Sequence, residues 1–289
     1  MITCHSEYGS IKSLLLSPAG NALQSQSKID QEWASLNYYQ RVNFEQALDE
    51  YAAFQELVGK DTELHFLPKS DASIDSIYCR DASLATDYGL ILCNMGKPAR
   101  NIEPQTQLKY FESIGLEVLG QIESPGTLEG GDMCWLNEKT LVVGHTYRSN
   151  PEGISQMKSF LEPKGIEIIV VDLPHYKGEH DVFHMMSILS PIDKDLAVVY
   201  SPLMPISFRK ELIARGFSFV ECPEEEFEQM GCNVLAISPR EVVINTGLPM
   251  TEQRLIEAGC TVHTYSGEEI SKKGEGGPTC LTRPIYREI

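Results

Sequence analysis

The chain carries little positive charge: 24 lysines and arginines stand against 41 acidic residues, giving a formal net charge of −17. Nucleic acids and anionic membranes would repel such a surface, so the sequence argues against both as partners. It also lacks a run of 18 apolar residues, so we expect no membrane span. The opening segment, MITCHSEYGSIKSLLLSPAG, has no basic start and only a short apolar run. This pattern predicts a cytoplasmic protein without a secretory signal.

Paired cysteine motifs are lacking too. The eight cysteines are scattered, with no C-x-x-C pair and no cysteine and histidine cluster of zinc spacing. We therefore expect reduced thiols, most of them buried in the core. His180 and His184 are four residues apart, but the run VFHMMSIL reads as the start of a strand, where metal geometry is not assured. We therefore predict no metal site.

What the chain does have is an internal repeat. Five β-rich segments begin at 63, 116, 166, 217 and 261, about fifty residues apart. Pairs of apolar runs around a polar turn, the pattern of a β-hairpin, cover 83–93, 133–144, 186–200 and 233–245. Amphipathic helical stretches follow the hairpins, and three of them end at Gly115, Gly165 and Gly259, which suit left-handed helix caps.

The two ends of the chain complete this pattern. The last strand, from Cys280, would pair with the first, from Ser13, to make a fifth hairpin. The chain, 1–289, is therefore predicted to form one α/β domain, a five-bladed pseudo-symmetric propeller of ββαβ units. The alternative, a doubly wound α/β sheet, needs mainly parallel strands, and the repeated hairpins argue against it.

Chemically active residues stand just ahead of the first hairpin strand in every unit. They are Asp81, the run Glu129 to Asp132, His184, Asn233 and Cys280. Fivefold pseudo-symmetry would bring them around one axis, so we expect a shared cavity. A thiolate beside an imidazole is suited to nucleophilic catalysis. We predict Cys280 as the nucleophile, His184 as the proton-transfer group, and Glu129 as the carboxylate that orients the imidazole and raises its pKa.

The remaining polar residues suit a planar cation with a carboxylate at its other end. A guanidinium has five donors that carboxylates hold well, so we expect Asp81 and Asp132, with Asn233, to bind substrate. Each acid could instead form a structural ion pair, Asp81 with Arg80 for instance. Arg100 lies 19 residues after Asp81, and Arg148 lies 19 after Glu129. This equal spacing places both arginines at the rim of the cavity, where we expect them to bind a substrate carboxylate.

Six segments carry a resemblance to a known superfamily, in this order: YCRD (78–81), EGGD (129–132), YRSN (147–150), FHMMS (183–187), GCNVL (231–235) and GGPTCLTRP (276–284). The sequence resembles the guanidine-modifying enzymes of the amidinotransferase and arginine deiminase superfamily. By size it is most similar to the dimethylarginine dimethylaminohydrolases. The resemblance implies a single catalytic domain with a propeller fold of the pentein type. It also implies the same nucleophile and proton-transfer pair, Asp81 as guanidinium ligand, and Arg100 and Arg148 as carboxylate ligands, with no metal or organic cofactor.

The resemblance also implies the chemistry, which is hydrolysis of a methylarginine-type substrate through a covalent thiouronium intermediate, giving citrulline and an amine. The expected partner is a small guanidino compound, and a homodimer stays an open option. Arginine deiminases usually carry an aspartate two residues after the histidine, whereas this chain has Met186. Loss of that carboxylate favours an N-substituted guanidine.

Other functions stay open at this stage. They are hydrolysis of unmodified arginine by a deiminase or dihydrolase, transfer of the amidino group to an amine, a peptide-cutting cysteine protease, and a non-catalytic propeller that binds a partner. The protease would not explain the paired acids. The non-catalytic reading predicts loss of the cysteine, histidine and acidic set, which this chain retains.

Overall fold

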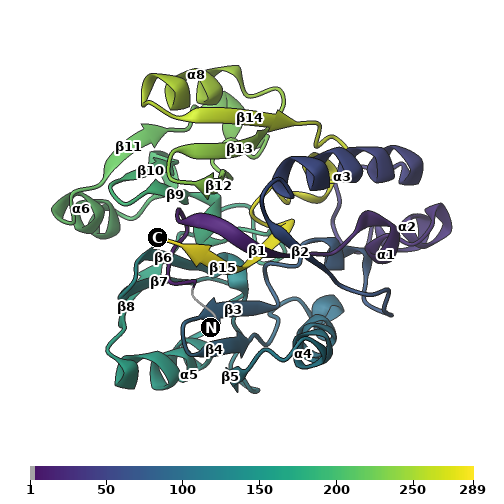
Figure 1. Ribbon diagram of the computed structural model, residues 1–289, viewed down its shortest axis with the longest axis horizontal. Helices are drawn as coiled ribbons and strands as arrows, with labels where there is room; N and C mark the ends of the chain where they lie inside the picture. Colours follow the sequence, from purple (N-terminus) through teal and green to yellow (C-terminus); the bar gives the residue numbers. More distant parts are fainter. Residues whose placement is uncertain (1–3) are drawn as a thin grey trace.

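A computed structural model describes residues 4–289. It contains five three-stranded sheets, each with the same strand pattern. In every sheet the middle strand is antiparallel to one neighbour and parallel to the other. The five sheets lie around the molecule with helices α3, α4, α5, α6 and α8 on its outside (Figure 1). This confirms the five-bladed α/β propeller of ββαβ units.

Four blades follow one another along the chain. The strands of each blade are named from inner to outer. The first blade contains β3 (Ser83–Thr86), β4 (Gly89–Leu92) and β5 (Val118–Gln121), and the second contains β6 (Met133–Asn137), β7 (Thr140–His145) and β8 (Glu167–Asp172). The third contains β9 (Leu189–Asp193), β10 (Leu196–Val199) and β11 (Ser218–Glu221), and the fourth contains β12 (Leu235–Ser238), β13 (Glu241–Asn245) and β14 (Thr261–Tyr265).

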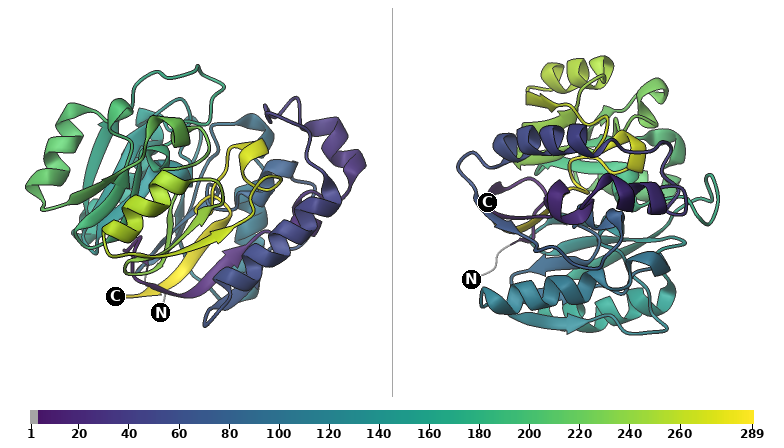
Figure 2. Two further views of the ribbon diagram at one scale, coloured as in Figure 1. Left: turned by 90° about the horizontal axis from the view of Figure 1, so that it is seen from above. Right: turned by 90° about the vertical axis from the view of Figure 1, so that its right-hand side faces the viewer.

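The fifth blade joins the two ends of the chain. Strand β1 (Ser10–Leu16) pairs antiparallel with β15 (Thr282–Glu288) and parallel with β2 (Glu63–Phe66). The left view of Figure 2 shows yellow β15 running beside purple β1. The predicted pairing of the last strand with the first is confirmed, and it closes the ring.

Except for α7, which lies between β11 and β12, the α-helices connect the middle strand of a blade to its outer strand. The α-helices are α1 (Ala19–Ala22), α2 (Gln26–Glu32), α3 (Phe44–Val58), α4 (Glu103–Ser113), α5 (Pro151–Leu161), α6 (Ile206–Ala214), α7 (Glu224–Phe227) and α8 (Pro249–Glu257). Short 3₁₀ turns are η1 (Ile74–Ile77), η2 (Pro98–Arg100), η3 (Gly130–Asp132), η4 (Glu162–Lys164), η5 (Met185–Ser187), η6 (Ser201–Leu203) and η7 (Lys272–Gly274).

Helix α5 shows why these segments are helical. Asn150 caps its first turn by accepting a hydrogen bond from the backbone N–H of Gly153 at 2.8 Å, and Pro151 occupies the first position. Ile154, Met157 and Leu161 recur at helical spacing and are buried. The segment ends at Gly165, whose φ of +81° is left-handed, as are those of Gly115 and Gly259. The predicted glycine caps are confirmed.

The inner strands bring the start of each blade to the ring's centre. Strand β15 contacts β3, β6 contacts β9, and β9 contacts β12. The candidate residues precede these strands, as the repeat requires. One local prediction was wrong: the segment after His184 forms the 3₁₀ turn η5, and β9 begins only at Leu189. Within residues 4–289, no helix is both long and apolar enough to cross a membrane.

Candidate active site

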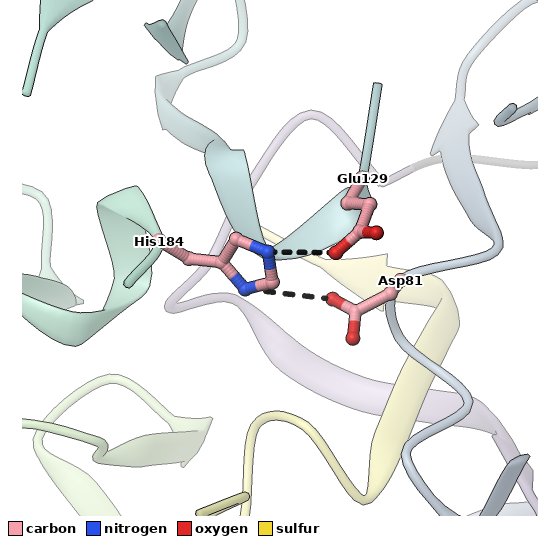
Figure 3. Close-up of side chains that lie close together, drawn as sticks. All are labelled: Asp81, Glu129 and His184. Carbon is pink, nitrogen blue, oxygen red and sulfur yellow. Dashed lines mark hydrogen bonds and ion pairs between the residues drawn. The ribbon is translucent and has the colours of Figure 1, made fainter. Parts of the chain in front are cut away.

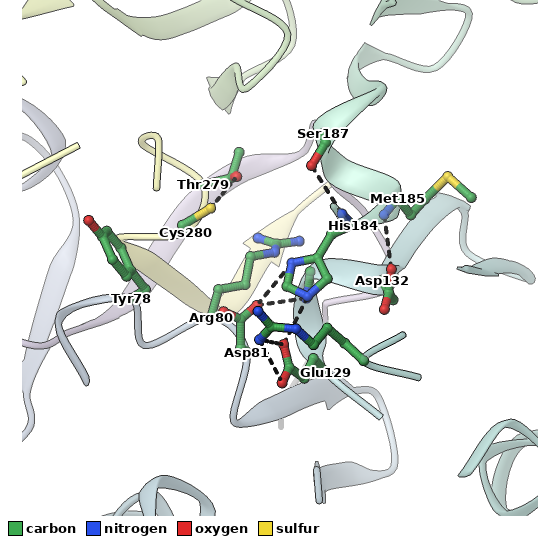
Figure 4. A network of polar contacts seen from close by, with 12 residues as sticks. Tyr78, Arg80, Asp81, Glu129, Asp132, His184, Met185, Ser187, Thr279 and Cys280 are labelled. Carbon is green, nitrogen blue, oxygen red and sulfur yellow. Dashed lines mark hydrogen bonds and ion pairs between the residues drawn. The ribbon is translucent and has the colours of Figure 1, made fainter. Parts of the chain in front are cut away.

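A cavity lies where the blades converge, and most of the predicted residues border it. The predicted residues along its wall are Asp81, Arg100, Arg148, His184, Asn233 and Cys280. Glu129 is fully buried behind this wall, in hydrogen-bond contact with His184. Figure 4 shows Cys280 beside Thr279 on the segment ahead of β15, and His184 on the segment ahead of β9. The expectation of one shared cavity holds for the six residues on the wall, and Glu129 reaches the cavity only through His184.

Glu129 and His184 form an ion pair at the centre of the site. His184 Nε2 lies 2.9 Å from Glu129 Oε2, and Nδ1 lies 4.0 Å from Asp81 Oδ1 (Figure 3). Burial by itself lowers the pKa of His184, but the charges of Asp132, Glu129 and Asp81 outweigh it and raise this pKa to about 9. Burial opposes the ionisation of Glu129, yet the His184 hydrogen bond and nearby arginines hold the pKa of its carboxyl far below the usual range. The surrounding carboxylates therefore favour the protonated imidazole.

Asp81 faces the same imidazole but is also held by the protein. Its Oδ2 accepts a hydrogen bond from Arg100 at 2.6 Å, and its Oδ1 accepts one from the backbone N–H of Gly131 at 2.9 Å. Its ion-pair partner is therefore Arg100, and the alternative pairing with Arg80 is wrong, because Arg80 pairs with Glu7 at 2.7 Å. Asp81 stays on the cavity wall, where a carboxylate retains further lone pairs for a cation.

The equal spacing of the two arginines has a structural meaning that differs from the one predicted. Each arginine pairs with the acid 19 residues before it: Arg100 with Asp81, and Arg148 with Glu129 at 3.4 Å. Arg100 is buried and donates also to Glu103 and to the carbonyl of Tyr78. It is therefore not the free cation expected at the rim. Arg148 is held more loosely, since its side-chain contacts are 3.4 to 3.5 Å long.

Asp132 does not reach the cavity, contrary to expectation. It is fully buried, and its Oδ2 accepts hydrogen bonds from Ser149 at 2.6 Å and Thr146 at 2.7 Å. Its Oδ1 accepts the backbone N–H of Met185 at 3.0 Å (Figure 4). Because Met185 follows the histidine directly, the carboxylate fixes the turn that carries His184. Asp132 therefore anchors the site from behind.

Cys280 is the one partly exposed cysteine among the eight, all of which lie within residues 4–289 as free thiols. Its Sγ is 3.3 Å from Asn233 Nδ2 and 3.9 Å from Thr279 Oγ1. Asn233 Oδ1 accepts hydrogen bonds from the backbone N–H and the hydroxyl of Thr279. Asn233 thus contacts the thiol itself, although we had predicted a contact with substrate. Burial and the nearby Asp81 charge raise the pKa of Cys280, while the Thr279 and Asn233 hydrogen bonds oppose that rise.

Several residues of the site were not predicted from the sequence. Thr279, Ser149 and Thr146 hold predicted residues in place through hydroxyl groups. Lys97 was missed because its contact with Glu129 Oε1, at 3.0 Å, comes from its backbone N–H, which any residue but proline could supply. Leu36, Tyr176 and Phe183 border the cavity from loops outside the repeated strands.

A metal ion would find three possible ligands here, since atoms of Asp81, Glu129 and His184 lie within 4.8 Å of one another. These atoms already have partners within the protein. The Nε2 of His184 contacts Glu129, and both carboxylates contact arginines. The donor set is therefore arranged as a network of ion pairs.

Comparisons with known proteins identify the family of this chain. The model of the eukaryotic N,N dimethylarginine dimethylhydrolase family matches residues 19–287. A dimethylarginine dimethylaminohydrolase of Pseudomonas aeruginosa is 25% identical over 241 residues, covering 83% of this chain and 89% of the relative. An arginine deiminase of Listeria welshimeri is also 25% identical, but this chain covers only 61% of its length.

Solved structures share the fold. The Pseudomonas aeruginosa dimethylarginine dimethylaminohydrolase, as a cysteine-to-serine variant with citrulline, has a TM-score of 0.77 at 22% identity, covering 96% of this chain and 99% of that one. The N-terminal domain of a cyanobacterial arginine dihydrolase, bound to substrate, has a TM-score of 0.81 at 17% identity, with the same coverage. Because the family model spans nearly the whole chain, this protein belongs to the N,N dimethylarginine dimethylhydrolase family and is a hydrolase that acts on C–N bonds of linear amidines.

Proposed function

We propose that this enzyme hydrolyses a methylarginine-type guanidinium, with Cys280 as nucleophile and with a ureido compound and an amine as products. The observation that carries the proposal is the buried Glu129–His184 ion pair, at 2.9 Å, beside the cavity that Cys280 and Asp81 also line. For a methylarginine the ureido product is citrulline.

In the first half of the reaction, Asp81 pairs with the substrate guanidinium and places its carbon near Cys280 Sγ. The free thiol has a raised pKa, so a bound cation is needed to favour the thiolate. The thiolate adds to the guanidinium carbon, and the C–N bond to the departing amine then breaks. The imidazolium of His184 gives its proton to that amine, leaving a thiouronium on Cys280.

In the second half, His184 is neutral and acts as a base. It takes a proton from water as the water oxygen bonds to the thiouronium carbon. The C–S bond then breaks as the proton left on the added hydroxyl is released to solvent, which regenerates the thiolate and gives the neutral ureido product. Glu129 stabilises the imidazolium that forms again, and Asp132 holds the turn beneath it. Asn233 stabilises the thiolate whenever it is free, by donating from its Nδ2, and Thr279 holds the Asn233 amide in place.

The reacting end of the substrate is inferred from Met186, which borders the cavity. A thioether next to the departing nitrogen suits an N-methyl group and leaves an unsubstituted nitrogen without a hydrogen-bond acceptor. Hydrolysis of plain arginine is the second candidate, because arginine deiminase and dihydrolase relatives have the same architecture. Of the two predicted carboxylate ligands, we retain Arg148 as a direct ligand, since its donors are the less engaged.

The test is to incubate the protein separately with arginine, monomethylarginine and asymmetric dimethylarginine, and to measure ureido product and released amine. We expect turnover of a methylated compound and at least a 10³-fold loss in Cys280→Ala. Activity retained in that variant would refute Cys280 as nucleophile. Turnover of arginine alone would select the second candidate.

A further inference from the structure

A second charged pair borders the cavity, and the mechanism does not use it. Lys97 Nζ lies 2.6 Å from Asp75 Oδ2 and 2.8 Å from the carbonyl oxygen of Leu36. All three residues border the cavity, and the Asp75 side chain is only 5% exposed. A carboxylate next to a carbonyl oxygen is a good binding site for an ammonium group. In this chain the ammonium is the protein's own.

Lys97 is also coupled to the groups that would hold the rest of a substrate. Its backbone N–H donates to Glu129 Oε1 at 3.0 Å, the same carboxylate that Arg148 contacts. The residue before it, Gly96, packs so closely on Arg148 that an added Cβ would lie 2.5 Å from the Arg148 carbonyl oxygen. The backbones of Gly96 and Arg148 are therefore in contact, and the side chains of Lys97 and Arg148 both border the cavity.

A substrate with an α-ammonium group meets a barrier here. To contact Asp75, the substrate ammonium must displace the Lys97 ammonium from Asp75 Oδ2 and the Leu36 carbonyl oxygen. Lys97 belongs to the same chain as these oxygens, so its ammonium competes at a high effective concentration. The displaced ammonium would also leave its position next to a buried carboxylate. A substrate carboxylate does not have to displace Lys97. The Lys97 ammonium has three N–H donors and, within residues 4–289, contacts only Asp75 and Leu36, so one N–H is free. The Arg148 guanidinium makes long contacts of 3.4 to 3.5 Å.

Other carboxylates on the cavity are placed less favourably. Glu228 pairs with Lys177, and its side chain is 45% exposed. Asp181 and Glu275 are also partly exposed, and burial raises the pKa of each above its ordinary value. Asp75 is thus the best buried carboxylate available outside the catalytic group, and Lys97 occupies it.

We propose that Lys97 is a specificity-determining residue that selects ω-guanidino acids, which carry a carboxylate but no α-ammonium, over α-amino acids such as arginine. This inference rests on the proposed function, since it concerns the tail of the same substrate. The guanidinium chemistry at Cys280 is unchanged, and the tail carboxylate binds Arg148 and the free N–H of Lys97.

The test compares Nω-methylarginine with Nω-methyl-5-guanidinopentanoate, which differs only in lacking the α-amino group. We expect the wild-type enzyme to favour the latter by about tenfold or more in kcat/KM, mainly through KM. Lys97→Met frees Asp75, so the preference should shrink by about tenfold or reverse. Adding Asp75→Asn to that variant should cancel its gain toward methylarginine. Lys109→Met, on an exposed helical lysine, is the matched control and should leave the ratio unchanged.

Each outcome decides a different point. Two results would overturn the role of Lys97 and leave the proposed function standing. One is a wild-type preference for methylarginine, and the other is an unchanged kcat/KM ratio of the two compounds in a folded Lys97→Met variant. The wild-type ratio needs no variant, so a folding defect in Lys97→Met leaves that measurement intact. Absence of Cys280-dependent turnover of both compounds overturns the proposed function, and the specificity inference with it.

Discussion

Replacing Glu129 by glutamine tests the electrostatics of the site. The rise in the pKa of His184 from 6.5 to about 9 corresponds to roughly 3 kcal/mol in favour of the imidazolium. Three carboxylates share this effect, and Glu129 is the one in hydrogen-bond contact. Its glutamine variant keeps the shape but loses the charge. We expect the pKa of His184 to fall by more than about one unit, and kcat at pH 8 to fall about 10²- to 10⁴-fold.

The assay is an NMR titration of the histidine ring protons, with His184→Asn used to assign the signal. Stability gives an independent measure. Because the pKa of His184 is raised on folding, its contribution to the unfolding free energy is complete below pH 6.5 and is lost as pH rises through about 9. That loss should be smaller in Glu129→Gln. A His184 pKa within about 0.3 of wild type in the variant would refute this account of the pair.

Three further predictions concern single residues. The alkylation rate of Cys280 by iodoacetamide should rise with pH and reach half its maximum above pH 9. Asn233→Ala should move that midpoint to higher pH. A midpoint near neutral pH would contradict the raised pKa of the thiol. Asp132→Ala leaves the buried donors of Thr146, Ser149 and Met185 without an acceptor. Chemical denaturation should therefore show that the free energy of unfolding falls by about 3 to 5 kcal/mol. A fall of less than about 1 kcal/mol would show that Asp132 does not hold the turn that carries His184. Met186→Asp should shift the kcat/KM ratio toward unsubstituted guanidines by about tenfold or more, and an unchanged ratio would remove Met186 from the specificity argument.

The sequence predicted the fold well because the repeat depends on local signals. Hairpin turns, amphipathic helices and left-handed glycine caps are each encoded within a few residues, and five copies reinforce one another. Closure of the ring by β1 and β15 followed from the count of units. The turn after His184 was mistaken for a strand because its apolar residues do not distinguish a buried 3₁₀ turn from a buried strand.

Partners of side chains were harder to predict than positions. The spacing of Arg100 and Arg148 revealed a repeated feature, but only the structure shows that each contacts the acid of its own unit. Asp132 stands at an equivalent position to the catalytic residues, yet its carboxylate contacts Ser149 and Thr146 behind the cavity. Side-chain direction depends on neighbours distant in sequence, and Lys97 contacts Glu129 through the backbone, which leaves no sequence pattern.

The central claim is that Cys280 forms a covalent bond with the guanidinium carbon, and intact-protein mass spectrometry of rapidly quenched reactions tests it most directly. With any guanidino substrate that the enzyme hydrolyses, we expect a covalent adduct of the protein. Its added mass should equal the mass of the substrate minus the mass of the departing amine. Peptide mapping should place it on Cys280, and Cys280→Ser should lack it. Steady turnover without an adduct on Cys280 at any quench time, together with activity in Cys280→Ser, would contradict the claim.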